Sequence, residues 1–234
     1  LPTAGPQTLA VGGFFKNSIC VTKGNQAYLS QYIGDLDNPD NCRYLQQTVD
    51  HLCSLFDIDV QQVACDLHPD FYSSRFARDY ADTRQLPLVE VQHHHAHGAA
   101  VAAERGIAGD YLALALDGLG LGTDGDLWGG ELLSLKSGEM ERLGHFKPLA
   151  LPGGDKAARE PWRLALALLI EQGQESRAHE IYGEQPGYAV LLQMINRGIN
   201  CPRTSSAGRL FDTAASLAGL CHHNSFEAEA AMRL

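Results

Sequence analysis

The sequence predicts an α/β fold made of two similar halves. Strand-like apolar runs alternate with segments of helical periodicity, and a pattern of strand, glycine turn and strand occurs twice. The first copy covers residues 8–22, with Gly12 and Gly13 in its turn, and the second covers residues 111–135, with its turn at 117–125. This repetition predicts an internally duplicated architecture, with a first half at residues 1–108 and a second at 109–234.

Helices and strands alternate between the two hairpins. Apolar residues follow a helical period at 41–56, and two further helices are expected at 71–80 and 94–105. Short buried strands are expected at 63–67 and 86–91. Because strands separated by helices normally run parallel, we expect a largely parallel sheet covered on both faces.

The pattern becomes mainly helical after the second hairpin. A loop at 148–155 leads to a helix at 161–172 that begins with proline, and another helix is expected at 187–197. Residues 203–220 predict a loop that feeds a helix. If the second half mirrors the first, two strands and a terminal helix are still missing where the sequence reaches Leu234.

Composition and charge narrow the class of protein. The chain has 234 residues, of which 44% are hydrophobic and 20% charged, as in soluble globular proteins. Its net charge of −10, without a Lys or Arg cluster, argues against binding to nucleic acid or a membrane surface. The chain has no signal-peptide pattern and no apolar run near the roughly 20 residues that cross a bilayer, so we expect a cytoplasmic protein. Its 6 cysteines include no CxxC pair and are expected to be reduced thiols.

The motif VQHHHAH at residues 91–97 is a candidate metal site. It lies where a strand ends and a helix begins, and open α/β sheets bind ligands there. His93 and His97 are four residues apart, so both imidazoles lie on one helix face and could hold one divalent cation. A solvated histidine-rich turn is the alternative. His94 and His95 are expected to support the ligands or to face substrate.

The second glycine turn is a candidate phosphate or metal site. Asp117 ends an apolar strand, where a carboxylate can bind a metal or a metal-bound water. Gly118 and Gly120 follow it and would let backbone amides approach a phosphate closely. The alternative is a tight turn without a ligand.

The first glycine turn offers a matching pair of polar residues. Lys16 and Asn17 follow Gly12 and Gly13, and could contact a phosphate from the first half. A lysine on an edge strand is the alternative.

The segment at 204–212 combines hydroxyl groups with a glycine before a helix. Ser205, Ser206 and Gly208 suit an anion or a sugar, and Asp212 could accept hydrogen bonds from ribose hydroxyls. Plain N-capping by Ser205 or Ser206 is the alternative.

Taken together, these motifs resemble the HypF carbamoyltransferase family, which acts in the maturation of nickel–iron hydrogenases. The resemblance covers essentially the whole chain. It rests on six motifs: AVGGFFKNS at 10–18, VQHHHAH at 91–97, LDGLGLGTDGDLWGGE at 116–131, LPGGD at 151–155, REPWR at 159–163 and SSAGRLFD at 205–212.

The resemblance implies a fold and a reaction. The fold would be the duplicated fold of actin, sugar kinases and heat-shock ATPases, in a domain similar to TsaD whose second half is incomplete here. An upstream domain of such enzymes makes carbamoyl adenylate from carbamoyl phosphate and ATP. The domain seen here would then pass the carbamoyl group to the C-terminal cysteine of HypE, on the way to the iron cyanide ligands.

The resemblance also implies roles for single residues. His93, His97 and Asp117 would hold a divalent metal, zinc or iron, while magnesium would accompany the nucleotide. Asp117 and His94 are the expected catalytic residues. Contacts with ATP, AMP or carbamoyl adenylate are expected from Gly12, Gly13, Lys16, Asn17, Gly118, Gly120, Gly208 and Asp212.

The chain departs from the family pattern in three places. The acylphosphatase-like, zinc-finger and adenylate-forming domains expected upstream are absent, so we expect that this chain alone does not make carbamoyl adenylate. The last strands of the second half, with a carboxylate that completes the metal site in relatives, are also absent. Ala228 stands where the family usually has glycine, which bears on the outer contacts with the nucleotide.

Other functions compete with this interpretation. One alternative is a metal-dependent sugar or acid kinase, or another acyl-adenylate transferase, of the same superfamily; a kinase would leave the histidine pair without a task. Another is an inert scaffold or interaction domain with solvated histidines. Metal analysis of the purified protein would distinguish a transferase from a scaffold. Mixing the protein with carbamoyl adenylate and HypE would distinguish a transferase from a kinase.

Overall fold

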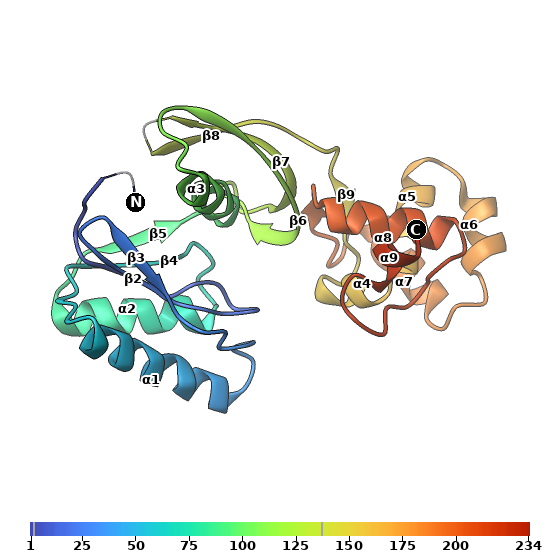
Figure 1. Ribbon diagram of the computed structural model, residues 1–234. Coiled ribbons are helices and arrows are strands. Elements are labelled where there is room, and N and C mark those ends of the chain that lie inside the picture. The colour runs from blue at the N-terminus through green and yellow to red at the C-terminus, as the bar shows by residue number, and fades with distance from the viewer. Residues whose placement is uncertain (2, 137) are drawn as a thin grey trace. The chain divides into compact units, whose positions relative to one another are not determined.

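The computed structural model describes residues 1, 3–136 and 138–234. The chain forms two compact units, Leu1–Asp110 and Tyr111–Leu234 (Figure 1). The repeated hairpin pattern predicted a division between residues 108 and 109. Both units combine strands and helices, which confirms the predicted α/β class.

The first unit is built on a five-stranded sheet with the order β3-β2-β1-β4-β5. Its strands are β1 (Thr8–Ala10), β2 (Cys20–Lys23), β3 (Gln26–Leu29), β4 (Gln62–Asp66) and β5 (Leu88–Val91). Strand β2 is antiparallel to both β1 and β3, whereas β4 runs parallel to β1 and β5 runs parallel to β4. The sheet is therefore mixed and not largely parallel as predicted, because the short links from β1 to β3 are hairpin connections and cannot cross over.

In the part of the first unit that the structure describes, three helices lie close to the predicted ranges: α1 (Pro39–Leu55), α2 (Tyr72–Arg84) and α3 (His93–Arg105). The side chain of Asn38 accepts a hydrogen bond from the Asn41 amide and so caps the start of α1. Helices α1 and α2 lie on the same side of the sheet (Figure 1). The core lies between them and the strands, where Leu45 and Ala77 from the helices join Val63 of β4.

The second unit has a sheet that is mainly antiparallel. Its strands are β6 (Tyr111–Leu121), β7 (Leu127–Lys136), β8 (Glu139–His145), β9 (Leu149–Ala150) and β10 (Arg203–Thr204). They follow the order β6-β7-β10-β9, with β8 also paired to β7, and the β7–β10 pair is parallel. The antiparallel β6–β7 pair confirms the hairpin that the sequence predicted at residues 111–135. Successive antiparallel strands β6, β7 and β8 repeat the arrangement of β1, β2 and β3, as the predicted duplication requires.

Among its described residues, the second unit has six helices: α4 (Asp155–Arg159), α5 (Trp162–Glu171), α6 (Glu175–Tyr182), α7 (Tyr188–Arg197), α8 (Ala207–Leu217) and α9 (Glu229–Arg233). Helices α5 and α7 match the predicted ranges, whereas α6 was not expected. Trp162, Tyr182 and Leu191 pack together in the core that α5, α6 and α7 share. Within the described residues, no helix is both long and apolar enough to cross a membrane.

Candidate metal and nucleotide sites

The histidine motif lies at the carboxyl end of β5, as the sequence predicted. Gln92 is the N-cap of α3, and its side-chain oxygen accepts a hydrogen bond from the His95 amide at 2.9 Å. The helix therefore starts at His93, one residue before the predicted start. This cap fixes the backbone of the turn that carries both His93 and His97.

The spacing of His93 and His97 suits one shared metal ion. Their Nε2 atoms lie 3.1 Å apart. Two nitrogens bound at about 2.0–2.1 Å to a tetrahedral zinc would lie roughly 3.3 Å apart, so the pair needs little movement to take the ion. The predicted third ligand, Asp117, belongs to the second unit and is described there.

A residue that the sequence did not mark contacts this pair. Asp66, the last residue of β4, lies with Oδ2 2.8 Å from His93 Nδ1, and its Oδ1 accepts from the His68 amide at 2.8 Å. Burial raises the pKa of Asp66, but the hydrogen bonds from His93 and the His68 amide outweigh it and hold the pKa below its ordinary value. The sequence signal that could have identified Asp66 is its place at the end of β4, the strand that pairs with β5.

His94, which we expected to be catalytic, is fully buried. Its Nδ1 lies 3.0 Å from Gln92 Nε2, and its ring meets the His93 ring edge to face. Gln92 thus holds both the helix start and the His94 ring. The two roles expected for His94, catalysis and support of the ligands, both stay predictions.

The first glycine turn depends on Gly12 and Asn17. Gly12 has a φ of +69°, and a Cβ there would lie 2.3 Å from the Ser18 carbonyl oxygen, so a side chain is excluded. The buried Asn17 amide donates to the carbonyls of Val11 at 2.9 Å and Gly13 at 2.7 Å. Asn17 therefore shapes the turn instead of offering these hydrogens to a phosphate.

Lys16 lies in the same turn with a left-handed backbone, at a φ of +49°. Its amide donates to Asp35 Oδ1 at 2.7 Å, and its side chain is exposed. Of the two polar residues predicted to meet a phosphate, Lys16 is the one whose side chain is accessible.

The second glycine segment differs from its prediction. Residues 117–121 continue strand β6, and the turn lies further on, where the Gly122 amide donates to the Asp126 carbonyl at 2.8 Å. Gly120 pairs with Trp128, and the register of β6 shifts between Leu116 and Gly120. Such irregularities re-aim side chains and are common beside active sites.

Asp117 and Gly118 lie within this irregular stretch of β6. Asp117 Oδ1 accepts from the Gly118 amide at 2.6 Å. The start of α8 approaches the same two residues: Ser206 caps the helix by accepting from the Arg209 amide at 3.1 Å, and its hydroxyl donates to the carbonyls of Asp117 and Gly118. Two predicted motifs far apart in sequence thus lie together, and the capping alternative is confirmed at Ser206.

Gly208 is part of this close approach. A Cβ on Gly208 would lie 3.2 Å from the Gly118 Cα, which is tighter than an ordinary contact. The two backbones therefore pack directly against each other, and the glycine at position 208 permits it.

Asp212, the predicted ribose contact, lies one helical turn into α8 and is 1% exposed. Its Oδ2 is 2.8 Å from Arg209 Nε, but accepts no hydrogen bond within the part of the chain that the structure describes. Burial raises the pKa of Asp212, and the Arg209 charge together with a hydrogen bond from the Asn224 side chain offsets only part of that effect. A buried carboxylate with a raised pKa is typical of a ligand-binding group.

Glu131 was quoted in a motif but was not predicted to act. It is fully buried on β7, and its carboxylate accepts from the amides of Gly129 at 3.0 Å and Gly130 at 3.2 Å, from Arg142 Nε at 2.7 Å and from the Ser205 hydroxyl. A lone glutamate next to an apolar run was the available signal, because a buried charge needs partners. Glu131 holds the loop that leads into α8.

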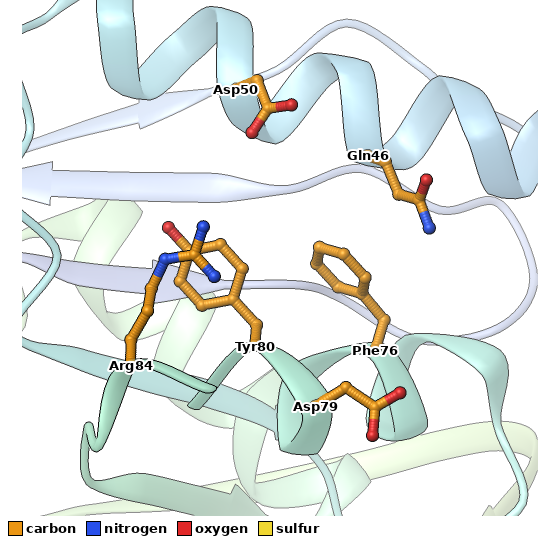
Figure 2. Close-up of a pocket in the computed structure, with 6 residues that line it drawn as sticks. All are labelled: Gln46, Asp50, Phe76, Asp79, Tyr80 and Arg84. Atoms are coloured by element: carbon orange, nitrogen blue, oxygen red, sulfur yellow. The ribbon is translucent and has the colours of Figure 1, made fainter. Parts of the chain in front are cut away.

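A surface depression of about 330 Å³ lies between α1 and α2 of the first unit. Figure 2 shows the rings of Phe76 and Tyr80 side by side, with the Arg84 guanidinium over the Tyr80 ring, 3.8 Å from its centre. Asp50 and Asp79 also line it. None of the site residues predicted from the sequence lines this depression.

Two family models match the chain. The model described as the HypF Kae1-like domain covers residues 3–104, and the model of the second subdomain of the Kae1-like domain of carbamoyltransferases covers residues 113–234. Together they match nearly the whole length.

Curated relatives and solved structures agree. The chain is 48% identical to carbamoyltransferase HypF2 of Cupriavidus necator in an alignment that covers 100% of this chain. It is 46% identical to carbamoyltransferase HypF of Rhizobium leguminosarum bv. viciae in an alignment that covers 97% of this chain. It spans 29% and 30% of those relatives. The crystal structure of full-length HypF in the phosphate- and nucleotide-bound form superposes with a TM-score of 0.91 and 37% identity, over 99% of this chain and 30% of that one. HypF of T. kodakarensis superposes with a TM-score of 0.87 and 32% identity, over 98% of this chain and 32% of that one. The chain belongs to the HypF carbamoyltransferase family.

Proposed function

We propose that this chain transfers the carbamoyl group of carbamoyl adenylate to the C-terminal cysteine of HypE, in the synthesis of the iron cyanide ligands of nickel–iron hydrogenases. The observation that carries the proposal is the His93 and His97 pair at the carboxyl end of β5, with Nε2 atoms 3.1 Å apart, in a member of the HypF family. Such a pair suits zinc or iron.

The proposed reaction is an acyl transfer. The HypE cysteine sulfur attacks the carbamoyl carbon, a C–S bond forms, and the bond from that carbon to the AMP phosphate oxygen breaks. The thiol proton passes to a basic side chain, for which His94 and Asp117 are the candidates. AMP leaves with the electron pair of the broken bond.

The residues of this chain would bind and orient the adenylate. A divalent cation held by His93 and His97 would supply a Lewis acid for the acyl phosphate. Backbone amides around Gly118 would donate to the oxyanion that develops on the carbamoyl group. The positive end of a helix and the exposed Lys16 both favour phosphate.

We propose Asp212 as the acceptor for ribose hydroxyls. Its buried Oδ2 is paired with Arg209 at 2.8 Å but accepts no well-aligned hydrogen bond within residues 1, 3–136 and 138–234, so a ribose hydroxyl would add a donor there. The approach of Ser206 to Asp117 and Gly118 supports a nucleotide contact at the start of α8. Magnesium would accompany the nucleotide phosphates.

The test combines a metal assay with a transfer assay. The chain is mixed with carbamoyl adenylate, HypE and either zinc or ferrous iron, and the mass of HypE is followed. We expect carbamoylated HypE with the wild-type chain and with His51→Ala, an exposed histidine on α1 used as the control. We expect neither bound metal nor transfer with His97→Ala.

Three results would contradict the proposal. One is equal metal content in the wild type and His97→Ala. Another is a wild-type chain that leaves HypE unmodified in the presence of either metal. The third is phosphate transfer from ATP to a sugar or acid hydroxyl, which would favour the kinase alternative.

A further inference from the structure

Asp66 lies beside the first turn of α3 because of the register of the sheet. Strands β4 and β5 are parallel, and Asp66 is in register with Val91. The carboxyl ends of both strands therefore meet at one edge of the sheet, where α3 begins. The Asp66 side chain is 7% exposed, and His93 and the His68 amide contact its two oxygens from different sides.

We propose that Asp66 is a positioning residue that sets the tautomer and the ring orientation of His93 for binding a divalent cation. The inference rests on the proposed metal site and extends it to a residue outside the ligand set. An ionised carboxylate only accepts hydrogen bonds, so His93 Nδ1 must carry the hydrogen that meets Asp66 Oδ2 at 2.8 Å. Nε2 of His93 then carries the lone pair that can bind a metal ion, and this atom lies 3.1 Å from His97 Nε2.

The contact has a chemical effect besides its geometry. A carboxylate bonded to the outer nitrogen of a histidine makes the inner nitrogen a more basic ligand, and losing such a partner typically lowers metal affinity about 10- to 100-fold. The ring also loses rotational freedom that binding would otherwise have to remove.

The backbone of α3 does not depend on Asp66. Gln92 caps the helix through the His95 amide, and Gln92 also contacts His94. Asp66 contacts the ring of His93 instead. A change at Asp66 should therefore release the ring while the helix start stays in place.

The first experiment measures the tautomer in the metal-free chain. Two-bond proton–nitrogen correlation spectra of the histidine rings at neutral pH distinguish hydrogen on Nδ1 from hydrogen on Nε2. We expect His93 in the Nδ1–H form in the wild type, and a shift toward the Nε2–H form in Asp66→Asn. A wild-type His93 in the Nε2–H form would overturn the inference without any variant.

The second experiment measures zinc affinity by competition with a chromophoric chelator. We expect Asp66→Asn to bind zinc about 10- to 100-fold more weakly than the wild type. Asp70→Asn, which changes an exposed aspartate of the same loop, should bind zinc as the wild type does.

The outcomes separate the two proposals. Wild-type zinc binding that Asp66→Asn keeps within about twofold would overturn the role of Asp66 alone, because a partner of this kind carries more than that. Zinc binding that His97→Ala leaves unchanged would overturn the proposed metal site itself.

Discussion

Replacing Glu131 with Gln isolates the charge of the buried network in the second unit. The glutamine keeps the shape of the side chain and one oxygen, which can still accept from Gly129 and Ser205. Its amide nitrogen replaces the oxygen that now lies 2.7 Å from Arg142 Nε. Two donors would then face each other in a fully buried position.

The cost can be estimated from these contacts. A hydrogen bond between charged groups contributes about 1.5–3 kcal/mol, and removing one partner of a buried ion pair costs about 3–5 kcal/mol. Arg142 keeps its contact with Asp124 at 3.0 Å and its position over the Trp128 ring. We therefore expect Glu131→Gln to lower the free energy of unfolding by about 2–3 kcal/mol at neutral pH.

The same network predicts a pH dependence. Burial raises the pKa of Glu131, but hydrogen bonds from Arg142, Ser205 and the amides of Gly129 and Gly130 outweigh it, and the net pKa is lowered. A carboxyl whose pKa is lowered by folding stabilises the fold above its unfolded pKa, and that contribution is lost as the pH falls through the folded pKa. The difference between wild type and Glu131→Gln should shrink below about pH 4.

The assay is urea denaturation followed by circular dichroism, at neutral and acidic pH. Glu141→Gln, an exposed glutamate on the neighbouring strand β8, is the matched control. We expect that control to lie within about 0.5 kcal/mol of the wild type. If Glu131→Gln behaves like the control at neutral pH, or if its deficit persists unchanged in acid, the reasoning is wrong.

Three further predictions follow from single residues. Ala228 has a φ of +62°, which strains a residue with a side chain. Ala228→Gly should raise the free energy of unfolding by up to about 1 kcal/mol, because the relief of strain exceeds the entropy cost of glycine. A lower melting temperature in this variant would contradict the prediction. The pKa of Asp212 is raised by burial, so its charge costs stability at neutral pH. Asp212→Asn should keep or raise the melting temperature and weaken AMP binding in calorimetry, whereas unchanged AMP affinity would exclude the ribose contact. Burial raises the pKa of Cys65 and of four other cysteines, which makes these thiols weaker nucleophiles at neutral pH. A full-length enzyme in which all six cysteines of this chain are replaced should therefore still transfer the carbamoyl group directly from the adenylate to HypE. A carbamoylated cysteine peptide from this chain would refute direct transfer.

Local signals predicted the helices well and the sheets less well. Helix α1 was predicted from apolar periodicity and α5 from the proline at its start, and both signals need only neighbouring residues. Strand β8 was missed because its half-buried positions, Met140, Arg142 and Gly144, do not form an apolar pattern. The direction of a strand is set by its partner, and the hairpin connections gave both sheets antiparallel pairs.

Gly118 and Gly120 were interpreted as part of a turn, but they belong to strand β6. Glycine is frequent in turns because it tolerates unusual backbone angles, and it also permits close approach of two backbones. Close approach of two backbones explains the glycine at position 129, on the neighbouring strand β7. A Cβ on Gly129 would lie 2.8 Å from the Asp117 carbonyl oxygen. A sequence alone does not distinguish these two uses.

Some contacts in the candidate sites follow from local spacing in the sequence, and others depend on the fold. His93 and His97 could be paired from the sequence because four residues along a helix fix their spacing. Asp66 is 27 residues from His93, and Glu131 is 74 residues from Ser205, so the contacts that hold these side chains depend on the fold. The short motifs therefore identified groups that could meet a ligand, but not the carboxylates that support them.

Each unit supports its candidate site with one buried carboxylate. In the first unit Asp66 fixes the ring of a proposed metal ligand, and in the second Glu131 fixes Ser205, next to the Ser206 hydroxyl that contacts Asp117. Charged acceptors give strong and directional hydrogen bonds, which hold a group where the surrounding loops would let it move. Because the two carboxylates share no partner, removing one should change metal affinity and removing the other should change the stability of the second unit, with little coupling between the two effects.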